Sequence, residues 1–136
     1  NEYKIKMEYI NGKLLKDLVS RLDDNEINKI FEKIGKYLAI MHNNNIIHGD
    51  LTTSNIILKN EEIYFIDFGL SNFSSRIEDM AVDLHLFYES LKSVHFDKLE
   101  VCWKSFLKGY KSEGENLEKI IKQLENLEKR GRYVKR

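Results

Sequence analysis

The sequence predicts an α+β fold that is mainly helical and carries one small β-hairpin. After position 24, apolar residues recur at the three- and four-residue intervals of amphipathic helices. Two short apolar runs, at 56–58 and 63–66, flank the polar tetrapeptide Lys-Asn-Glu-Glu, which is the pattern of a hairpin. The chain has 136 residues, of which 42% are hydrophobic and 32% charged. These values indicate one folded, soluble domain with a single core.

The first half of the chain is expected to contain a strand and a long helix. Residues 3–10 alternate apolar with polar side chains, which predicts a half-buried strand that ends at an Asn-Gly turn. Either Asp23 or Asp24 has the side chain to cap a helix that stops at the three asparagines of 43–45. The apolar residues that predict this helix are Ile27, Ile30, Phe31, Ile34, Leu38 and Met41.

The second half is expected to be helical. Ser75 is followed three residues later by Glu78, a capping-box pattern that predicts the start of a helix. The apolar stripe of this helix comprises Ile77, Ala81, Leu84, Tyr88 and Leu91. Two further amphipathic segments follow, over 96–110 and 117–127.

Charge and cysteine content exclude several classes of protein. The 22 basic residues balance the 22 acidic ones, so the overall charge does not indicate a nucleic-acid or membrane binder. Cys102 is the only cysteine, which excludes an internal disulfide and a cysteine-based zinc site and fits a reducing compartment. No apolar run approaches the roughly 20 residues of a membrane span. The first residues neither start with methionine nor form a signal peptide, which suggests a chain that begins within a longer protein.

The chemical signal lies in polar residues within an apolar frame. His48, Asp50 and Asn55 belong to the stretch His-Gly-Asp-Leu-Thr-Thr-Ser-Asn, here called the HGD loop (residues 48–55), and Asp-Phe-Gly begins twelve residues after Asn55. These motifs resemble the catalytic loop and the metal-binding motif of protein-kinase-like enzymes. The resemblance implies that Asp50 orients or deprotonates the acceptor and that His48 holds the loop backbone. It also implies that Asn55 and Asp67 bind Mg²⁺ on the phosphates of ATP.

Each motif taken alone has a weaker interpretation. Asp-Phe-Gly is a common tripeptide, and a histidine in an apolar frame is more often a satisfied core residue than a catalytic one. The HGD loop also fits a polar turn between strands, or a catalytic loop that has lost its function. The loop, its apolar flanks, the preceding helix and the spacing to Asp67 together favour the kinase-like fold.

The beginning of the chain extends the resemblance. Residues 5–18 resemble the strand, hinge and first helix that join the two lobes of a kinase. The match implies that Met7 lies behind the adenine of ATP. It further implies that the Glu8 carbonyl and the Ile10 amide make the adenine hydrogen bonds. An ordinary edge strand followed by a turn is the alternative.

The hinge match predicts the domain organisation. Residues 1–136 form a kinase-like C-terminal lobe, in which 1–12 are the last N-lobe strand and the hinge, and 129–136 are a basic tail. No Gly-x-Gly-x-x-Gly motif occurs in the chain. The glycine-rich loop and the strand lysine of a kinase are therefore expected to precede Asn1, and this lobe alone is expected to bind ATP poorly.

Departures from ordinary protein kinases are informative. Gly49 replaces the loop arginine that reads a phosphorylated activation segment, and Thr52 replaces a lysine that meets the transferring phosphate. The chain has no proline, and nine residues separate Gly69 from Asp79. So short a segment offers little platform for a peptide substrate, and we expect no control by its phosphorylation.

The combined motifs resemble one family of atypical kinases. HGDLTTSN, DFG, the following EDMAVDLHLF and the final KRGRYVKR are similar to the small Bud-type (p53-related protein kinase) subunit of the KEOPS complex. This resemblance implies a cytoplasmic serine/threonine protein kinase or ATPase. It would hydrolyse Mg-ATP in support of threonylcarbamoyladenosine formation in tRNA, together with the threonylcarbamoyl-transferase subunit and other KEOPS subunits. Asp83 would support the catalytic-loop backbone, whereas a solvated helix face is the alternative for Asp79 and Asp83.

The tail supplies the only local cluster of positive charge. Its cations are Lys129, Arg130, Arg132, Lys135 and Arg136. Such a patch next to Tyr133 suits contact with the phosphates and bases of tRNA. A solvated helix end, whose cations favour the helix dipole, is the alternative.

Three functions from different classes therefore remain. The favoured one is the ATP-hydrolysing subunit described above. A small-molecule phosphotransferase of the aminoglycoside type would need an acidic acceptor pocket and no basic tail. A catalytically silent scaffold would use the same fold to hold partners. The presence of Asp50, Asn55 and Asp67 argues against this function.

Overall fold

The computed structural model describes residues 11–134, and their side chains as far as Lys129. The strand expected at 3–10 lies outside the described residues, as do Met7, Glu8 and Ile10. The elements, in chain order, are β1 (Lys13–Leu14), α1 (Leu15–Leu18), η1 (Val19–Arg21), α2 (Asp24–Asn43), β2 (Ile46–Ile47), η2 (Thr53–Asn55), β3 (Ile56–Lys59), β4 (Glu62–Phe65), β5 (Asn72–Phe73), α3 (Ile77–Val94), η3 (Phe96–Lys98), α4 (Leu99–Glu113) and α5 (Leu117–Val134).

Helix α2 begins and ends where the sequence predicts. Asp23 caps it by accepting a hydrogen bond from the Glu26 amide at 2.8 Å, and the Glu26 carboxylate accepts one from the Asp23 amide at 3.1 Å. The helix ends at Asn43, and Asn45 has φ of +62°, which a continuing helix does not allow. The apolar face that predicted it is buried at Ile27, Phe31, Ile34 and Leu38.

The predicted hairpin is confirmed, although it is not the only β-structure. Strands β3 and β4 pair antiparallel around Asn60 and Glu61, whose positive φ values of 51° and 67° suit a tight hairpin turn. Strand β1 adds to the other edge of β3, and β2 pairs with β5 in a second sheet. The sequence did not predict β1, β2 and β5, because these strands have two residues each, too few to show alternation.

The predicted capping box of α3 is also wrong. The helix starts at Ile77, one residue later than a Ser75 cap requires, and no side chain caps it. Ser74 is the serine that organises this turn. Its hydroxyl accepts a hydrogen bond from the Arg76 amide at 3.1 Å and donates to the Asp79 carboxylate at 2.6 Å. The serine that organises the start of α3 is therefore Ser74, one position before the Ser75 of the capping-box pattern.

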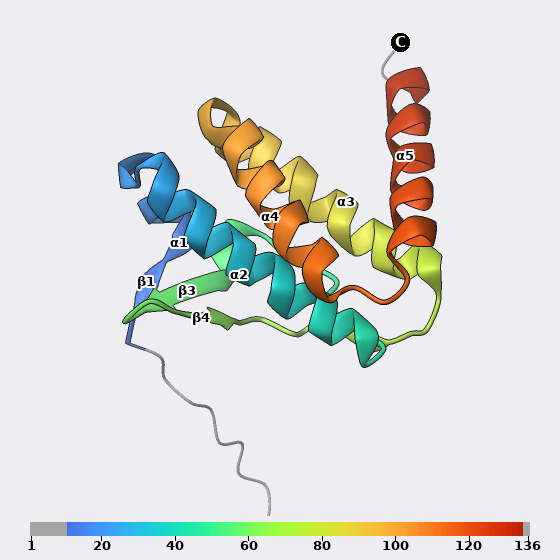
Figure 1. Cartoon of the computed structure of the whole chain (residues 1–136), viewed down its shortest axis with the longest axis horizontal. Helices are drawn as coiled ribbons and strands as arrows, with labels where there is room; N and C mark the ends of the chain where they lie inside the picture. The colour runs from blue at the N-terminus through green and yellow to red at the C-terminus, as the bar shows by residue number, and fades with distance from the viewer. Residues whose placement is uncertain (1–10, 135–136) are drawn as a thin grey trace, which may run out of the picture.

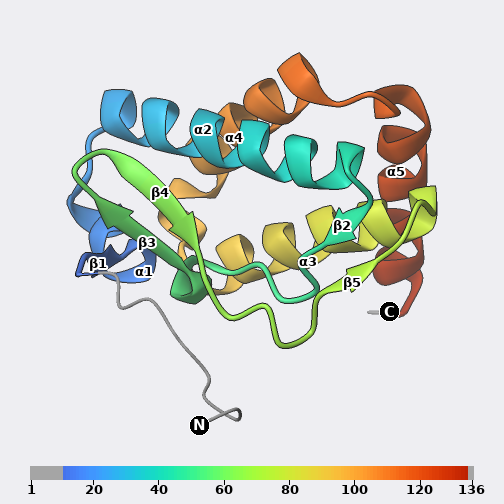
Figure 2. The same ribbon diagram turned by 90° about the horizontal axis from the view of Figure 1, so that it is seen from below.

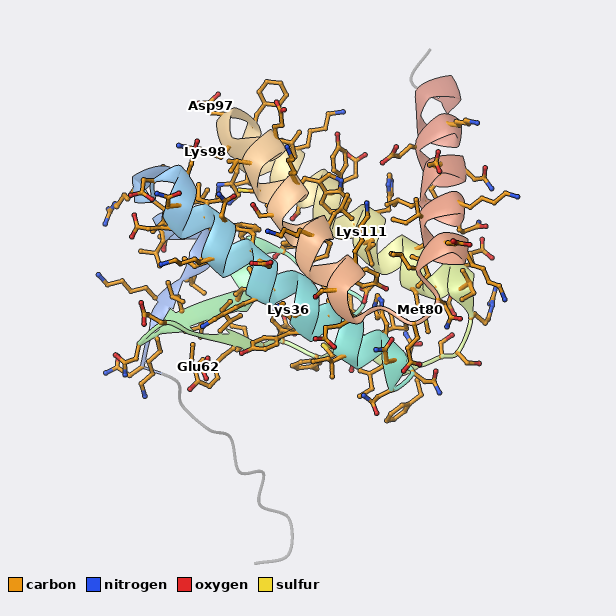
Figure 3. The ribbon with its side chains drawn as sticks, viewed as in Figure 1. Lys36, Glu62, Met80, Asp97, Lys98 and Lys111 are labelled. Carbon is orange, nitrogen blue, oxygen red and sulfur yellow. The ribbon has the colours of Figure 1, made fainter. Side chains whose placement is uncertain are left out.

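Helices α2, α3 and α4 form the body of the molecule. Figure 1 shows α2 between the β3–β4 hairpin and α4, with α5 standing beside one end of α3, against which it packs. In Figure 2, the chain between β2 and β3 crosses α3 on the side that faces the viewer. In the view of Figure 3, the labelled Glu62 of the hairpin and Lys98 next to α4 lie on opposite sides of α2. The segment expected to be helical from 96 begins with the 3-10 turn η3, and α4 follows from Leu99.

Two glycines allow α2 and α4 to approach closely. A Cβ built on Gly35 would lie 2.0 Å from the Phe106 carbonyl oxygen, and one built on Gly109 would lie 1.9 Å from the Glu32 carbonyl oxygen. Cys102 is buried on α4, and burial raises the pKa of its thiol to about 12, so it is no reactive thiolate near neutral pH. Within residues 11–134, no helix has the length and apolar character needed to cross a membrane.

Candidate active site

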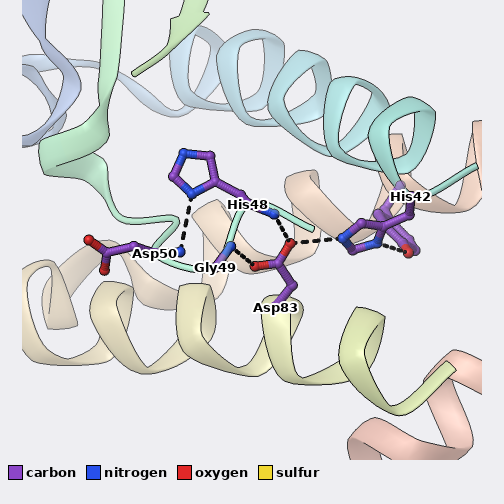
Figure 4. Close-up of polar contacts among 6 residues, drawn as sticks. His42, His48, Gly49, Asp50 and Asp83 are labelled. Atoms are coloured by element: carbon purple, nitrogen blue, oxygen red, sulfur yellow. Dashed lines mark hydrogen bonds and ion pairs between the residues drawn. The ribbon is translucent and has the colours of Figure 1, made fainter. Parts of the chain in front are cut away.

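Asp83 holds the first half of the HGD loop. Its carboxylate accepts hydrogen bonds from the main-chain amides of His48 at 3.0 Å and Gly49 at 2.9 Å (Figure 4). The residue is 1% exposed and lies on α3, so the alternative of a solvated helix face is wrong for it. These two hydrogen bonds fix the direction of the loop backbone, because each N–H must point towards the carboxylate oxygen that accepts it. This is the contact that the kinase resemblance implies for Asp83.

His48 connects the HGD loop to the end of the hairpin. Its Nε2 lies 3.0 Å from the Ile66 carbonyl oxygen, and its Nδ1 lies 3.2 Å from the Asp50 amide. A carbonyl only accepts and an amide only donates, so the ring carries its proton on Nε2. The side chain is fully buried and tilts against Phe68 with 4.7 Å between ring centroids. His48 therefore sets the position of the loop backbone and does not face the solvent where a substrate would bind.

Asp50 and Asn55 are tied to each other across the HGD loop. The Asn55 amide nitrogen donates to the Asp50 carbonyl oxygen at 2.8 Å and lies 3.3 Å from the Asp50 carboxylate. These contacts occupy the nitrogen end of the amide and leave its oxygen as the end available to a ligand. The main-chain oxygen of Asn55 accepts from the Ile66 amide at 2.9 Å. The hairpin thus brings Ile66, the residue before Asp67, next to Asn55.

Asp67 and Asn55 offer the oxygen atoms that a hard cation prefers. Asp67 is exposed and has φ of +57°, an uncommon conformation for an aspartate that often marks a functional position. Among the described side chains, no group of three or more His, Cys, Asp or Glu residues gathers into a metal cluster. Two oxygen ligands nevertheless fit Mg²⁺, which keeps several waters and takes phosphate oxygens as further ligands.

Comparison with known families agrees with this geometry. A family model described as "Protein kinase domain" matches residues 1–92. This chain belongs to the protein kinase domain family. The kinase-like fold predicted from the HGD loop and its spacing to Asp67 is therefore confirmed.

Curated relatives narrow the similarity to Bud-type kinases, as the motifs predict. A "Probable bifunctional tRNA threonylcarbamoyladenosine biosynthesis protein" of Methanococcus vannielii is 46% identical over 131 residues, which cover 96% of this chain and 23% of the relative. The "KEOPS complex subunit Bud32" of Pyrococcus abyssi is 42% identical over 97% of this chain and 61% of its own length. The "Probable serine/threonine-protein kinase BUD32 homolog" of Archaeoglobus fulgidus is 41% identical over 99% and 65%. The chain thus spans less than two thirds of the length of each of these relatives.

Sterics explain why this kinase domain has Gly49 at the position where ordinary kinases have arginine. Its φ is +89°, and a Cβ built on it would lie 2.3 Å from the Leu70 carbonyl oxygen. The segment after Asp67, here called the DFG segment (residues 67–76), thus packs main chain against main chain on the HGD loop. The sequence showed that position 49 has no cationic side chain. It did not show that the Leu70 main chain lies too close to Gly49 for any side chain to fit.

We expect the substitution Gly49→Ala to lower the free energy of unfolding by about 2 kcal/mol, because the positive φ and the Leu70 carbonyl both oppose a Cβ. The DFG segment should also become more sensitive to proteolysis. Urea unfolding and limited digestion measure the two effects. Ser75→Ala, at an exposed position of the same segment, is the control and should change neither. A Gly49→Ala protein as stable as the wild type would contradict the steric interpretation.

The sequence did not reveal two further residues that support the site. His42 Nε2 lies 2.9 Å from the Asp83 carboxylate, and His42 Nδ1 lies 2.7 Å from the Tyr110 hydroxyl. Burial, together with the negative charge of Asp83, raises the pKa of Tyr110, which keeps its hydroxyl protonated and able to donate. His42 then presents a proton on Nε2 to Asp83. Both residues continue apolar stripes of their helices, so periodicity alone marks them as ordinary core positions.

Thr52, Asp79 and the basic tail complete the residues that the sequence singled out. The Thr52 hydroxyl accepts a hydrogen bond from the Ser54 amide at 3.2 Å and so closes the turn η2. Asp79 is half-buried and accepts from Ser74, so it too is more than a solvated helix residue. In the basic tail, Lys129 is exposed on α5. The side chains of Arg130, Arg132, Lys135 and Arg136 lie outside the described residues.

Proposed function

We propose that this chain is the C-terminal lobe of an atypical kinase that hydrolyses Mg-ATP in support of threonylcarbamoyladenosine modification of tRNA. The observation that carries the proposal is similarity over 96–99% of the chain to relatives whose names state tRNA threonylcarbamoyladenosine biosynthesis, KEOPS and Bud32. The arrangement of Asp50, Asn55 and Asp67 around one loop supports an active enzyme over a silent scaffold.

In the proposed reaction, each polar residue of the site has a distinct role. Asp50, held through its amide by His48, orients a water molecule towards the terminal phosphate and accepts its proton. The Asn55 amide oxygen and the Asp67 carboxylate would hold Mg²⁺, whose charge offsets the negative charge of the phosphates. Met7, Glu8 and Ile10 remain the proposed adenine contacts, on the strength of the sequence resemblance.

Two features favour water over a peptide as the acceptor. Thr52 brings no positive charge to the transferring phosphate, and its hydroxyl is used within η2. The DFG segment is short, and the contact of its Leu70 carbonyl with Gly49 keeps it close to the HGD loop. A long peptide therefore has little surface on which to align.

The proposed partners follow from the names of the relatives. One relative is named as a KEOPS complex subunit and another as a bifunctional biosynthesis protein, which supports association with the threonylcarbamoyl-transferase subunit and the other KEOPS subunits. The basic tail is proposed to contact tRNA, and exposed Lys129 at its start supports this assignment.

The substitution Asp67→Ala tests the metal assignment. In the full-length natural protein, assayed with its transferase partner and tRNA, we expect Mg-ATP turnover to fall by about 100-fold or more, because the phosphates lose a carboxylate-bound cation. The control is Asp97→Ala, which removes an exposed carboxylate from η3. Its turnover should match the wild type. Turnover that survives Asp67→Ala would reject the metal assignment.

Removal of residues 129–136 tests the contact with tRNA. We expect weaker tRNA binding, and a slope of log affinity against log salt that falls by about one for each phosphate that the protein no longer neutralises. The matched control is the pair Lys119→Ala and Lys122→Ala, which removes exposed cations from the first half of α5. Unchanged affinity together with an unchanged slope in the truncated protein would rule out the tail as a tRNA-binding element.

A further inference from the structure

A buried hydrogen bond joins the HGD loop to the far end of α3. The Oγ1 of Thr53 lies 2.8 Å from Nε2 of His95, although 42 positions separate the two residues. Thr53 is 2% exposed and His95 is 9% exposed. A polar contact so well shielded from water is stronger than one at the surface, and removing one partner leaves the other unsatisfied.

The position of His95 is set by its own backbone. Its amide donates to the Leu91 carbonyl at 2.8 Å, which closes the last turn of α3. Its carbonyl accepts from the Lys98 amide at 2.9 Å, which closes η3. Both main-chain groups are therefore used at the junction of two elements. The imidazole projects from this rigid junction towards the loop.

The charge state of the His95 ring is compatible with the contact near neutral pH. Burial, and to a smaller extent the positive charge of Lys16, lowers the pKa of His95. The neutral ring satisfies a hydroxyl in either tautomer, because the Thr53 hydroxyl both donates and accepts. The contact between the two side chains therefore does not depend on a particular tautomer.

We propose that His95 is a positioning residue for phosphoryl transfer, which acts through Thr53 on the half of the HGD loop that ends in Asn55. The Asp83 carboxylate holds the other half, at the amides of His48 and Gly49. Thr53 and Asn55 share η2, and the main-chain amide of Asn55 donates to the Thr52 carbonyl at 3.0 Å, so both residues belong to one hydrogen-bonded turn. Thr53 thereby sets where the Asn55 oxygen points. This inference rests on the function proposed above.

The experiment compares paired substitutions in the full-length natural protein. Thr53→Val keeps the shape of the side chain but removes the hydroxyl, whereas Thr53→Ser keeps the hydroxyl. His95→Leu removes the ring nitrogens, whereas His95→Gln places an amide nitrogen near the position of Nε2. Ser93→Ala, an exposed position two residues before His95, is the control. The measurements are kcat and KM for Mg-ATP, and calorimetric binding of ADP at increasing Mg²⁺ concentration.

We expect Thr53→Val and His95→Leu to lower kcat by about tenfold and to weaken the Mg²⁺-dependent binding of ADP by a similar factor, because a mispositioned Asn55 affects the metal site. Thr53→Ser and His95→Gln should recover both quantities to within about threefold of the wild type, and Ser93→Ala should change neither.

Equal kcat and equal ADP binding within each pair would overturn the inference, even if the Val or Leu variant had a lower Tm. The proposed function would stand in that case, provided that the wild type turns over Mg-ATP and Asp67→Ala does not. A wild type without turnover would overturn the proposed function and this inference together. If Thr53→Val does not fold, the inference is tested by comparing kcat and ADP binding between His95→Leu and His95→Gln.

Discussion

Gly35→Ala is expected to lower the free energy of unfolding by about 2–3 kcal/mol, although alanine is the better helix former. A Cβ at this position would lie 2.0 Å from the Phe106 carbonyl oxygen and 2.7 Å from the Tyr110 amide nitrogen. Both are main-chain atoms of α4, so relief requires the two helices to separate. Urea unfolding of the full-length protein, followed by circular dichroism, measures the effect.

The size and sign of this effect distinguish packing from helix propensity. Propensity alone predicts a gain of about 1 kcal/mol for glycine to alanine within a helix. Gly109→Ala should behave like Gly35→Ala, since its Cβ would meet the Glu32 carbonyl oxygen. Lys29→Ala, at an exposed position of α2, should change stability by no more than about 0.5 kcal/mol. A more stable Gly35→Ala protein would contradict the close approach of α2 and α4.

Asp83→Asn is expected to destabilise the protein by about 3–5 kcal/mol and to abolish most ATP turnover. The carboxylate accepts hydrogen bonds from the amides of His48 and Gly49 and from His42 Nε2. An amide side chain replaces one accepting oxygen with a donor, so at least one of these buried N–H groups would face another N–H. The HGD loop would then lose its orientation together with its stability.

The matched control for this substitution lies one helical turn away. Asp79→Asn, on the same helix, removes a carboxylate that accepts one hydrogen bond, from Ser74, and should cost about 1 kcal/mol with little change in turnover. Urea unfolding and steady-state ATPase assays measure both variants. If Asp83→Asn retained wild-type stability and turnover, Asp83 would not hold the loop.

The sequence predicted the helices and strands that are long enough to show a periodic pattern of apolar residues. Helix α2 has a capping residue, an extended apolar face and an asparagine stop, and all three signals agree with its bounds. The strands β1, β2 and β5 have two residues each, and they form because the rest of the fold brings their partners alongside. The start of α3 was wrong because Ser74 competes with Ser75 for the turn, a choice that local motifs do not resolve.

The candidate site shows a similar division. Asp50, Asn55 and Asp67 were predicted from motif and spacing, because the chemistry proposed for them needs given residue types at given offsets. The support given by His42 and His95 was missed, because each reaches a partner about 40 residues away in the chain. Long-range contacts of this kind depend on tertiary packing, on which a single sequence carries no direct signal.

The contact between Gly49 and the DFG segment bears on how the enzyme is controlled. A switch needs two arrangements of similar free energy, and a modification then changes which one is populated. Here the segment is held at Gly49 by backbone contact and at Phe73 by pairing with Ile46. Displacing it would break both attachments, while Gly49 offers no cation to attract a phosphate to a second position. We therefore expect that the proposed turnover is not controlled by a rearrangement of this segment.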